Sequence, residues 1–190
     1  MDHLWAPWRM EFIRRERGAG CVFCRLPAER EKLRDNLIVH LGKACFVILN
    51  RYPYTCGHLM VVPRRHTSDY LSLTDKENAE TTRFLQTSLG ILTKTYGPEG
   101  FNMGVNLGHA AGAGIREHLH HHLIPRWVGD SNFLPVIGKT RSLPELLIET
   151  YDRLRPHFRR LEASGELPRG GHDETEGDDQ TDPRAERSDA

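Results

Sequence analysis

The chain of 190 residues lacks any uninterrupted apolar run long enough to cross a membrane, so no membrane association is expected. It also lacks a basic start followed by an apolar stretch and a small-residue cleavage site, so secretion is not expected either. Cysteine is scarce. Four residues, two of them close together at Cys21 and Cys24, do not resemble the framework of a disulfide-rich secreted domain. These absences favour a cytoplasmic protein whose thiols serve metal or thiol chemistry.

The formal net charge is zero, but the charges are unevenly distributed along the chain. Residues 164–190 hold nine acidic residues against three arginines, a net charge of −6, so the preceding residues carry +6. A positive charge favours anionic ligands such as polyphosphate nucleotides, whereas no interleaved basic and aromatic pattern suggests a nucleic acid partner. The tail has no aromatic residue and little apolar surface to bury. We therefore expect one folded domain over 1–163 and a disordered acidic tail over 164–190.

The apolar pattern predicts five short strands and two longer helices. The strands are rich in β-branched or aliphatic residues and are expected at 37–41, 45–49, 58–62, 101–107 and 118–124. One helix should begin after Thr74, which is followed by acidic residues, and end near Tyr96. A second should run from Ser142 or Leu143 to Leu161. The absence of regular βαβ alternation indicates an α+β fold.

Histidine dominates the segment from His118 to His122, in which only Leu119 is not a histidine. In a β-strand alternate side chains share one face, so His118, His120 and His122 are expected to lie side by side, with His121 packed on the opposite face. A glycine-rich segment at 108–114 precedes them, and backbone N–H groups in such a loop can approach phosphate oxygens. Neutral imidazole is both a nucleophile and a tolerable leaving group near neutral pH. The pattern therefore indicates a reactive histidine site beside a loop that can hold phosphate oxygens.

These residues resemble the histidine-triad (HIT) family, whose signature alternates three histidines with apolar residues. Pro125, Arg126 and Trp127, the run 129–133, and the N-terminal segment 4–10 with Cys21 and Cys24 are similar to bacterial members related to diadenosine tetraphosphate phosphorylases. The family is also distantly related to galactose-1-phosphate uridylyltransferases. The resemblance implies an antiparallel five-stranded sheet flanked by helices and a homodimer. The sequence departs from the family pattern at His121.

The resemblance also implies roles for individual residues. His120 would attack the α-phosphorus and form a nucleotidyl-histidine, and His122 would donate to a phosphate oxygen. Asn50 would bind the ribose hydroxyls, although capping of the following turn would explain it as well. The α-phosphate would be held by Asn106 and by the backbone at Gly112, Ala113 and Gly114. Many relatives carry hydrogen-bonding side chains near Ala113 and Gly114, where this chain offers only its backbone. Candidates to supply positive charge, each equally explained as a solvated surface residue, are Arg116, Arg126 and Lys139.

Cys21 and Cys24 have the two-residue gap that lets both thiolates reach one tetrahedral ion. A redox pair or two unconnected thiols would explain the spacing too. In zinc-containing relatives the remaining ligands correspond to His66 and His118, so the resemblance implies a structural zinc ion. The sequence does not decide whether a divalent cation accompanies a polyphosphate substrate.

The resulting hypothesis is a nucleotidyl transferase that cleaves dinucleoside polyphosphates with phosphate as acceptor. A hydrolase of dinucleoside polyphosphates or nucleoside phosphoramidates, with the same nucleophile, is the first alternative. The second is a zinc-stabilised nucleotide-binding protein without catalysis, which the lack of side-chain donors at Ala113 and Gly114 favours modestly.

Overall fold

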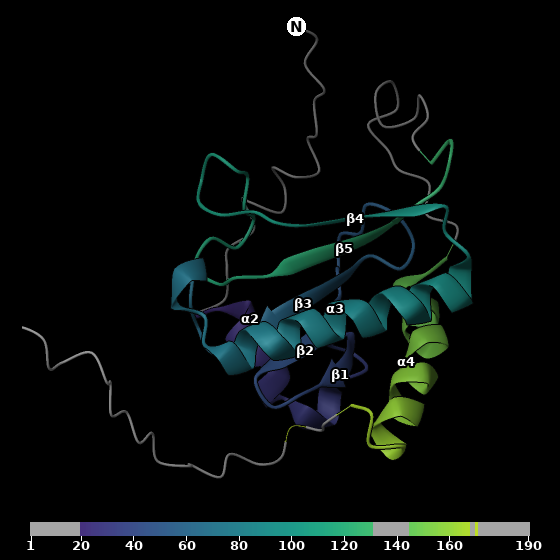
Figure 1. The fold of residues 1–190 in the computed structure, drawn as a ribbon, viewed down its shortest axis with the longest axis horizontal. Coiled ribbons are helices and arrows are strands. Elements are labelled where there is room, and N and C mark those ends of the chain that lie inside the picture. Colours follow the sequence, from purple (N-terminus) through teal and green to yellow (C-terminus); the bar gives the residue numbers. More distant parts are fainter. Residues whose placement is uncertain (1–19, 131–144, 168–169, 171–190) are drawn as a thin grey trace, which may run out of the picture.

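The computed structural model describes residues 20–130, 145–167 and 170. Within them, five strands form one antiparallel sheet in the order β1-β2-β3-β5-β4 (Figure 1). The strands are β1 (Ile38–Leu41), β2 (Cys45–Leu49), β3 (Leu59–Pro63), β4 (Gly100–Val105) and β5 (His121–Arg126). The helices are α2 (Val22–Ala28), α3 (Asp75–Tyr96) and α4 (Leu147–Ala163), with short 3₁₀ helices at Arg30–Lys32 and Tyr70–Ser72. The predicted α+β class and flanked antiparallel sheet are confirmed, and none of the helices in this described part is long and apolar enough to cross a membrane.

Four strands begin within one residue of their predicted starts, but β5 does not. It begins at His121, three residues after the predicted start at His118, and runs to Arg126. The prediction that one strand carries all three histidines of the triad is therefore wrong. Helix α2, which no sequence pattern indicated, begins directly after Cys21 and ends at Ala28.

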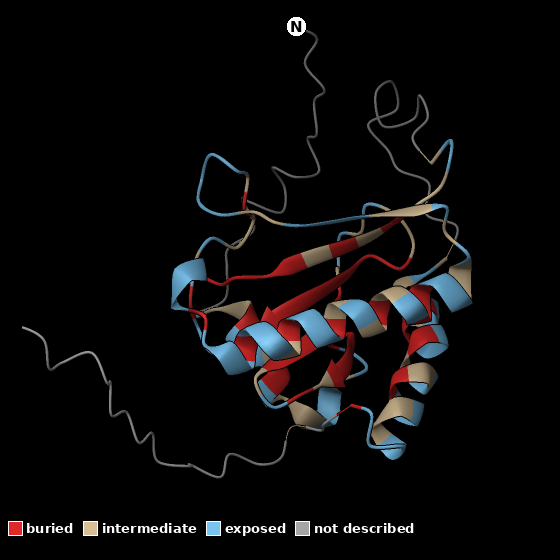
Figure 2. Ribbon diagram, in the orientation of Figure 1, coloured by how far each residue is buried: buried red, intermediate tan, exposed pale blue. Residues whose placement is uncertain are grey.

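Helix α3 has the boundaries that its sequence predicts, because both ends are capped. The Thr74 hydroxyl accepts from the backbone N–H of Glu77, and the Glu77 carboxylate accepts from the backbone N–H of Thr74. At the other end Gly97 adopts a left-handed conformation with φ of 55°. The helix lies across one face of the sheet (Figure 1), and buried and exposed residues alternate along it (Figure 2). Phe84 and Leu92 are fully buried.

Helix α4 packs against β1 and α3, with Leu154 and Phe158 fully buried. It begins at Leu147 rather than at the predicted Ser142 or Leu143, so that expectation is wrong; residues 142–144 themselves lie outside the described residues. A glutamate in the first turn caps the helix. The Glu149 carboxylate accepts from the backbone N–H of Leu146 at 3.2 Å.

The packed part of the chain continues beyond the predicted boundary at residue 163. Leu167 is buried in the core, and the backbone N–H of Gly170 donates to the carbonyl of Leu41 on the edge strand β1. The first residues of the acidic tail are therefore part of the fold. The rest of the tail, residues 168–169 and 171–190, lies outside the described residues, as do the segments 1–19 and 131–144.

Candidate active site

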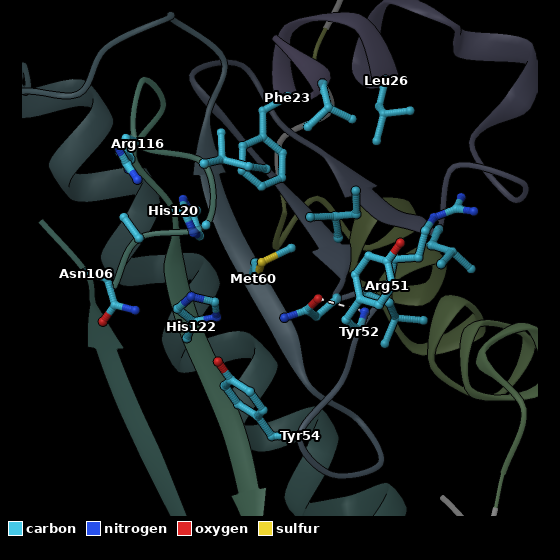
Figure 3. Close-up of a pocket in the computed structure, with 18 of the residues that line it drawn as sticks. Phe23, Leu26, Arg51, Tyr52, Tyr54, Met60, Asn106, Arg116, His120 and His122 are labelled. Carbon is cyan, nitrogen blue, oxygen red and sulfur yellow. Dashed lines mark hydrogen bonds between the residues drawn. The ribbon is translucent and has the colours of Figure 1, made fainter. Parts of the chain in front are cut away.

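A cavity of about 380 Å³ lies beside β2, β3 and β5 (Figure 3). His122 of β5 pairs with Met60 of β3, and both line the cavity. Their neighbours Leu59 and Leu123 are fully buried and point to the opposite face of the sheet. In Figure 3, Asn106, Arg116, His120 and His122 occupy one side of the view and Leu26, Arg51 and Tyr52 the other. The aliphatic and aromatic side chains of the lining include Val22, Phe23, Leu26, Leu37, Ile48, Leu49, Met60 and Ile115.

His120 lies just before β5, with its ring held in one tautomer. Its Nδ1 is 2.8 Å from the carbonyl oxygen of His118, which can only accept, so Nδ1 carries the proton. When the ring is neutral, Nε2 therefore has a free lone pair, and the ring lines the cavity. Burial lowers the pKa of His120, which favours the neutral ring near pH 7. Phe23 of α2 packs against the ring, with centroids 5.2 Å apart.

His122 is oriented by a fourth histidine, His58, which is fully buried behind it. The backbone N–H of Tyr54 donates to Nδ1 of His58 at 3.2 Å, so the proton of a neutral His58 is on Nε2. That Nε2 is 2.9 Å from Nδ1 of His122 and donates to it. The remaining proton of His122 is then on its own Nε2, where it is a hydrogen-bond donor for a ligand in the cavity.

His118 belongs to a different cluster, together with Cys21, Cys24 and His66. Its Nδ1 is 3.3 Å from Sγ of Cys21, 3.6 Å from Sγ of Cys24 and 3.3 Å from Nδ1 of His66. All four ligand atoms lie within 4.8 Å of one another. Zinc–sulfur bonds of about 2.3 Å and zinc–nitrogen bonds of about 2.0 Å at tetrahedral angles put ligand atoms roughly 3.3 to 3.8 Å apart, so the donor set fits such an ion.

The tautomer of His118 also suits a metal ligand. Its Nε2 is 2.8 Å from the carbonyl oxygen of Pro63 at the end of β3, so Nε2 carries the proton and Nδ1 is free to coordinate. This ring contact replaces backbone pairing at that point, and the next N–H, that of Leu119, donates to Thr67 instead. These contacts explain why β5 begins only at His121 and why the triad divides between two clusters.

The structure brings every predicted nucleotide-binding residue to the cavity: Asn50, Asn106, Gly112, Ala113, Gly114 and His122. Asn50 also has the capping role that the sequence left open, because its Oδ1 accepts from the backbone N–H of Tyr52 at 2.9 Å. Its amide nitrogen is 3.4 Å from the His58 ring. His121 is buried on the other face, beside Tyr70, as expected.

The three candidate cationic side chains differ in their position relative to the cavity. Arg116 lines the cavity and is exposed to solvent. Arg126 does not line it, and its guanidinium donates to both carboxylate oxygens of Asp130. Lys139 lies outside the described residues.

Sequence reasoning missed the roles of His58 and Phe23. In the sequence His58 is only the expected first residue of the strand at 58–62. A histidine directly before the apolar residues of β3, two positions from the cavity residue Met60, is the signal that the sequence offers. Phe23 lies between the two cysteines and contacts His118 and His120, and its apolar character next to the expected metal ligands is the signal that the sequence offers.

A five-stranded antiparallel sheet whose histidines line a cavity on one face defines a histidine-triad protein. The HIT domain matches residues 31–128, and the chain belongs to the HIT family.

Individual relatives extend the similarity over more of the chain. An AP-4-A phosphorylase from Mycobacterium tuberculosis is 40% identical over 157 residues, which cover 79% of this chain and 80% of that protein. Among solved structures, a hypothetical histidine triad nucleotide-binding protein from Sulfolobus tokodaii has a TM-score of 0.61 at 25% identity, covering 80% of this chain and 100% of its own. A zinc-bound histidine triad family protein from Mycobacterium smegmatis has a TM-score of 0.59 at 26% identity, with 76% and 97% covered.

Proposed function

We infer that this protein is a nucleotidyl transferase that cleaves dinucleoside polyphosphates, with His120 as nucleophile and inorganic phosphate as acceptor. One observation carries the proposal: the hydrogen bond from Nδ1 of His120 to the carbonyl of His118 leaves the Nε2 lone pair available to the cavity. The similarity to an AP-4-A phosphorylase supports the choice of substrate and acceptor.

In the first step Nε2 of His120 forms a bond to the α-phosphorus of diadenosine tetraphosphate, and the bond from that phosphorus to its bridging oxygen breaks. ATP leaves with that oxygen. The ring becomes a positively charged nucleotidyl-imidazolium whose Nδ1–H stays on the His118 carbonyl. The Nε2–H of His122 donates a hydrogen bond to a phosphate oxygen as negative charge develops there.

In the second step an oxygen of inorganic phosphate forms a bond to the same phosphorus, and the phosphorus–nitrogen bond breaks. The electron pair returns to Nε2 of His120, and ADP is released. Water in place of phosphate would give AMP, so the acceptor alone separates a phosphorylase from a hydrolase.

Different parts of the cavity lining are suited to different parts of the substrate. The apolar lining is suited to an adenine base, Asn50 to the ribose, and Asn106 with the backbone of residues 112–114 to the α-phosphate. The lining side chains include no carboxylate. A divalent cation that accompanies the substrate would therefore be held by the polyphosphate itself.

The cluster of Cys21, Cys24, His66 and His118 is suited to structural zinc. Bound there, the ion would link the four side chains and take no part in the reaction, because protein ligands would fill all four coordination positions. It would hold the N-terminal end of α2 to the segment that precedes β5. The homodimer and the cytoplasmic location implied at the outset stay predictions, and light scattering of the purified protein tests the first.

Incubation with diadenosine tetraphosphate, with and without inorganic phosphate, tests the proposed function. We expect ADP plus ATP that depend on phosphate. AMP plus ATP at all phosphate concentrations would instead identify the hydrolase. No turnover of any mononucleotide or dinucleotide substrate would identify a protein that only binds nucleotides.

A variant assigns the nucleophile. His120→Ala should abolish turnover while leaving mononucleotide binding measurable by calorimetry. His157→Ala removes a histidine from α4, away from the cavity, and is the matched control that should leave turnover unchanged. Normal turnover by His120→Ala would exclude His120 as the attacking group.

A further inference from the structure

Arg116 places a positive charge at the wall of the cavity. Among the described residues, no acceptor lies within hydrogen-bond or ion-pair distance of its guanidinium, although the side chain lines the cavity. Other arginines of the fold are engaged: Arg65 with Glu77, Arg126 with Asp130 and Arg155 with Glu162. Fold stability therefore does not explain Arg116, which leaves its charge available to a ligand.

Its position selects the part of a ligand that it can meet. Arg116 comes two residues after Gly114 of the glycine-rich loop and lies with Asn106, His120 and His122 on one side of the cavity (Figure 3). Arg51, the other arginine that lines the cavity, is on the opposite side and donates to the backbone carbonyl of Asp35. Arg116 therefore lies at the phosphate side and Arg51 at the nucleoside side.

The second step of the proposed reaction needs a group that binds a free anion. Inorganic phosphate must be held close to the nucleotidyl-histidine, in competition with water at far higher concentration. Ala113 and Gly114 provide only backbone donors, and the lining on this side holds no lysine. A guanidinium is permanently charged and can hold two phosphate oxygens at once, which a neutral imidazole cannot do.

We propose that Arg116 binds the acceptor phosphate and thereby directs the nucleotidyl group to phosphate rather than to water. This inference rests on the proposed function, and it makes Arg116 a specificity-determining residue for the second step. The bonds that form and break are those of the second step of phosphorolysis, and Arg116 neither gives nor takes a proton in that step.

The test compares Arg116→Gln, Arg116→Lys and the matched control Arg159→Gln, which removes an exposed arginine from α4. Each protein is given diadenosine tetraphosphate over a range of phosphate concentrations, and ADP, AMP and ATP are quantified. Loss of a charged hydrogen-bonding partner predicts that Arg116→Gln raises the phosphate concentration for half-maximal ADP formation by about 10- to 100-fold. AMP should increase at the expense of ADP. Arg116→Lys should recover part of the phosphate dependence, and Arg159→Gln should match the wild type.

A single-turnover measurement without phosphate separates the two steps. ATP release should be as fast in Arg116→Gln as in the wild type, because the first step needs no acceptor. Slower ATP release with unchanged phosphate dependence would show that Arg116 holds the donor instead and would overturn the proposal. A wild-type protein that forms AMP at every phosphate concentration contradicts the proposed function as well. A wild-type phosphorylase whose phosphate dependence is untouched by Arg116→Gln contradicts this inference alone.

Discussion

Replacement of His58 by phenylalanine isolates the contribution of a side chain that never touches the cavity contents directly. In the native protein Nδ1 of His58 accepts a hydrogen bond from the backbone N–H of Tyr54, and its Nε2–H donates a hydrogen bond to Nδ1 of His122. A phenyl ring preserves the stacking on Tyr54, whose ring centroid is 5.0 Å away, but offers no N–H. His122 can then hold its proton on Nδ1, and its Nε2 lone pair would face the phosphate.

The expected size of the effect follows from what is removed. Loss of a donor aimed at developing charge typically slows kcat by about 10²- to 10³-fold. His58→Phe removes only the group that selects the tautomer, so a fraction of His122 still presents its Nε2–H. We therefore expect kcat to fall by roughly 10- to 100-fold, with little change in KM because the cavity lining is intact.

A double-mutant cycle with His122→Ala checks this reasoning. If His58 acts through His122, the double variant should be no slower than His122→Ala alone. Nitrogen NMR of the imidazole rings should show His122 moving from the Nε2–H to the Nδ1–H tautomer in His58→Phe. If the reductions in kcat multiply in the double variant, or if the tautomer of His122 is unchanged, His58 does not act through His122 and is only a packing residue.

The remaining predictions concern the metal cluster and the stability of the fold. The native protein should contain about one zinc ion per chain by elemental analysis, and Cys21→Ser should lower both the zinc content and kcat; a metal-free native protein with full activity would contradict this. Thr74→Ala removes the cap of α3 and should lower the free energy of unfolding by about 1 kcal/mol, or Tm by roughly 2–4 °C in a chain of this size, whereas Thr74→Ser should cost little; equal losses in calorimetry would exclude the capping contribution. Burial lowers the pKa of His40 below its ordinary 6.5, against the opposing effect of Glu162, with Arg155 and Glu80 as the other nearby charges. As pH falls below about 6.5, His40 binds a proton more readily in the unfolded chain than in the folded chain. The contribution of His40 to the free energy of unfolding is therefore constant above that pH and falls on acidification. His40→Asn should reduce the loss of stability between pH 7 and 5.5 in urea titrations, and an identical loss would show that other groups cause it.

The parts of the fold that local chemistry specifies could be predicted from the sequence. Helix α3 is an example, since Thr74, Glu77 and Gly97 encode both of its ends without help from the rest of the chain. Strands β2 and β3 are fully buried along their length, and their apolar runs were sufficient to place them. The four predicted metal ligands converge, although up to 97 residues separate two of them, because the resemblance to a known family supplied the long-range information.

What could not be predicted depends on contacts between distant segments. A strand pattern through His118 and His120 is sound locally, but Pro63 and Thr67 provide competing hydrogen-bond partners that no local pattern reveals. The hydrogen bond from His58 to His122 depends on the antiparallel pairing that places β3 beside β5. Arg116 and Arg126 were indistinguishable in the sequence, and only the position of Asp130 showed which of them is already neutralised.

His118 connects the two clusters into which the triad divides. Its ring is held at Nε2 by Pro63 and faces the cysteines at Nδ1, so the position of residue 118 is fixed from both sides. The carbonyl of the same residue then receives the Nδ1–H of His120. Because the ring and the carbonyl of His118 belong to one residue, a metal ion that fixed the ring would also fix the orientation and the tautomer of His120, the proposed nucleophile. A metal ion bound by Cys21, Cys24, His66 and His118 would therefore influence the proposed reaction without contacting the substrate, because it would fix the carbonyl that holds the proton of His120 on Nδ1 and leaves Nε2 free to attack.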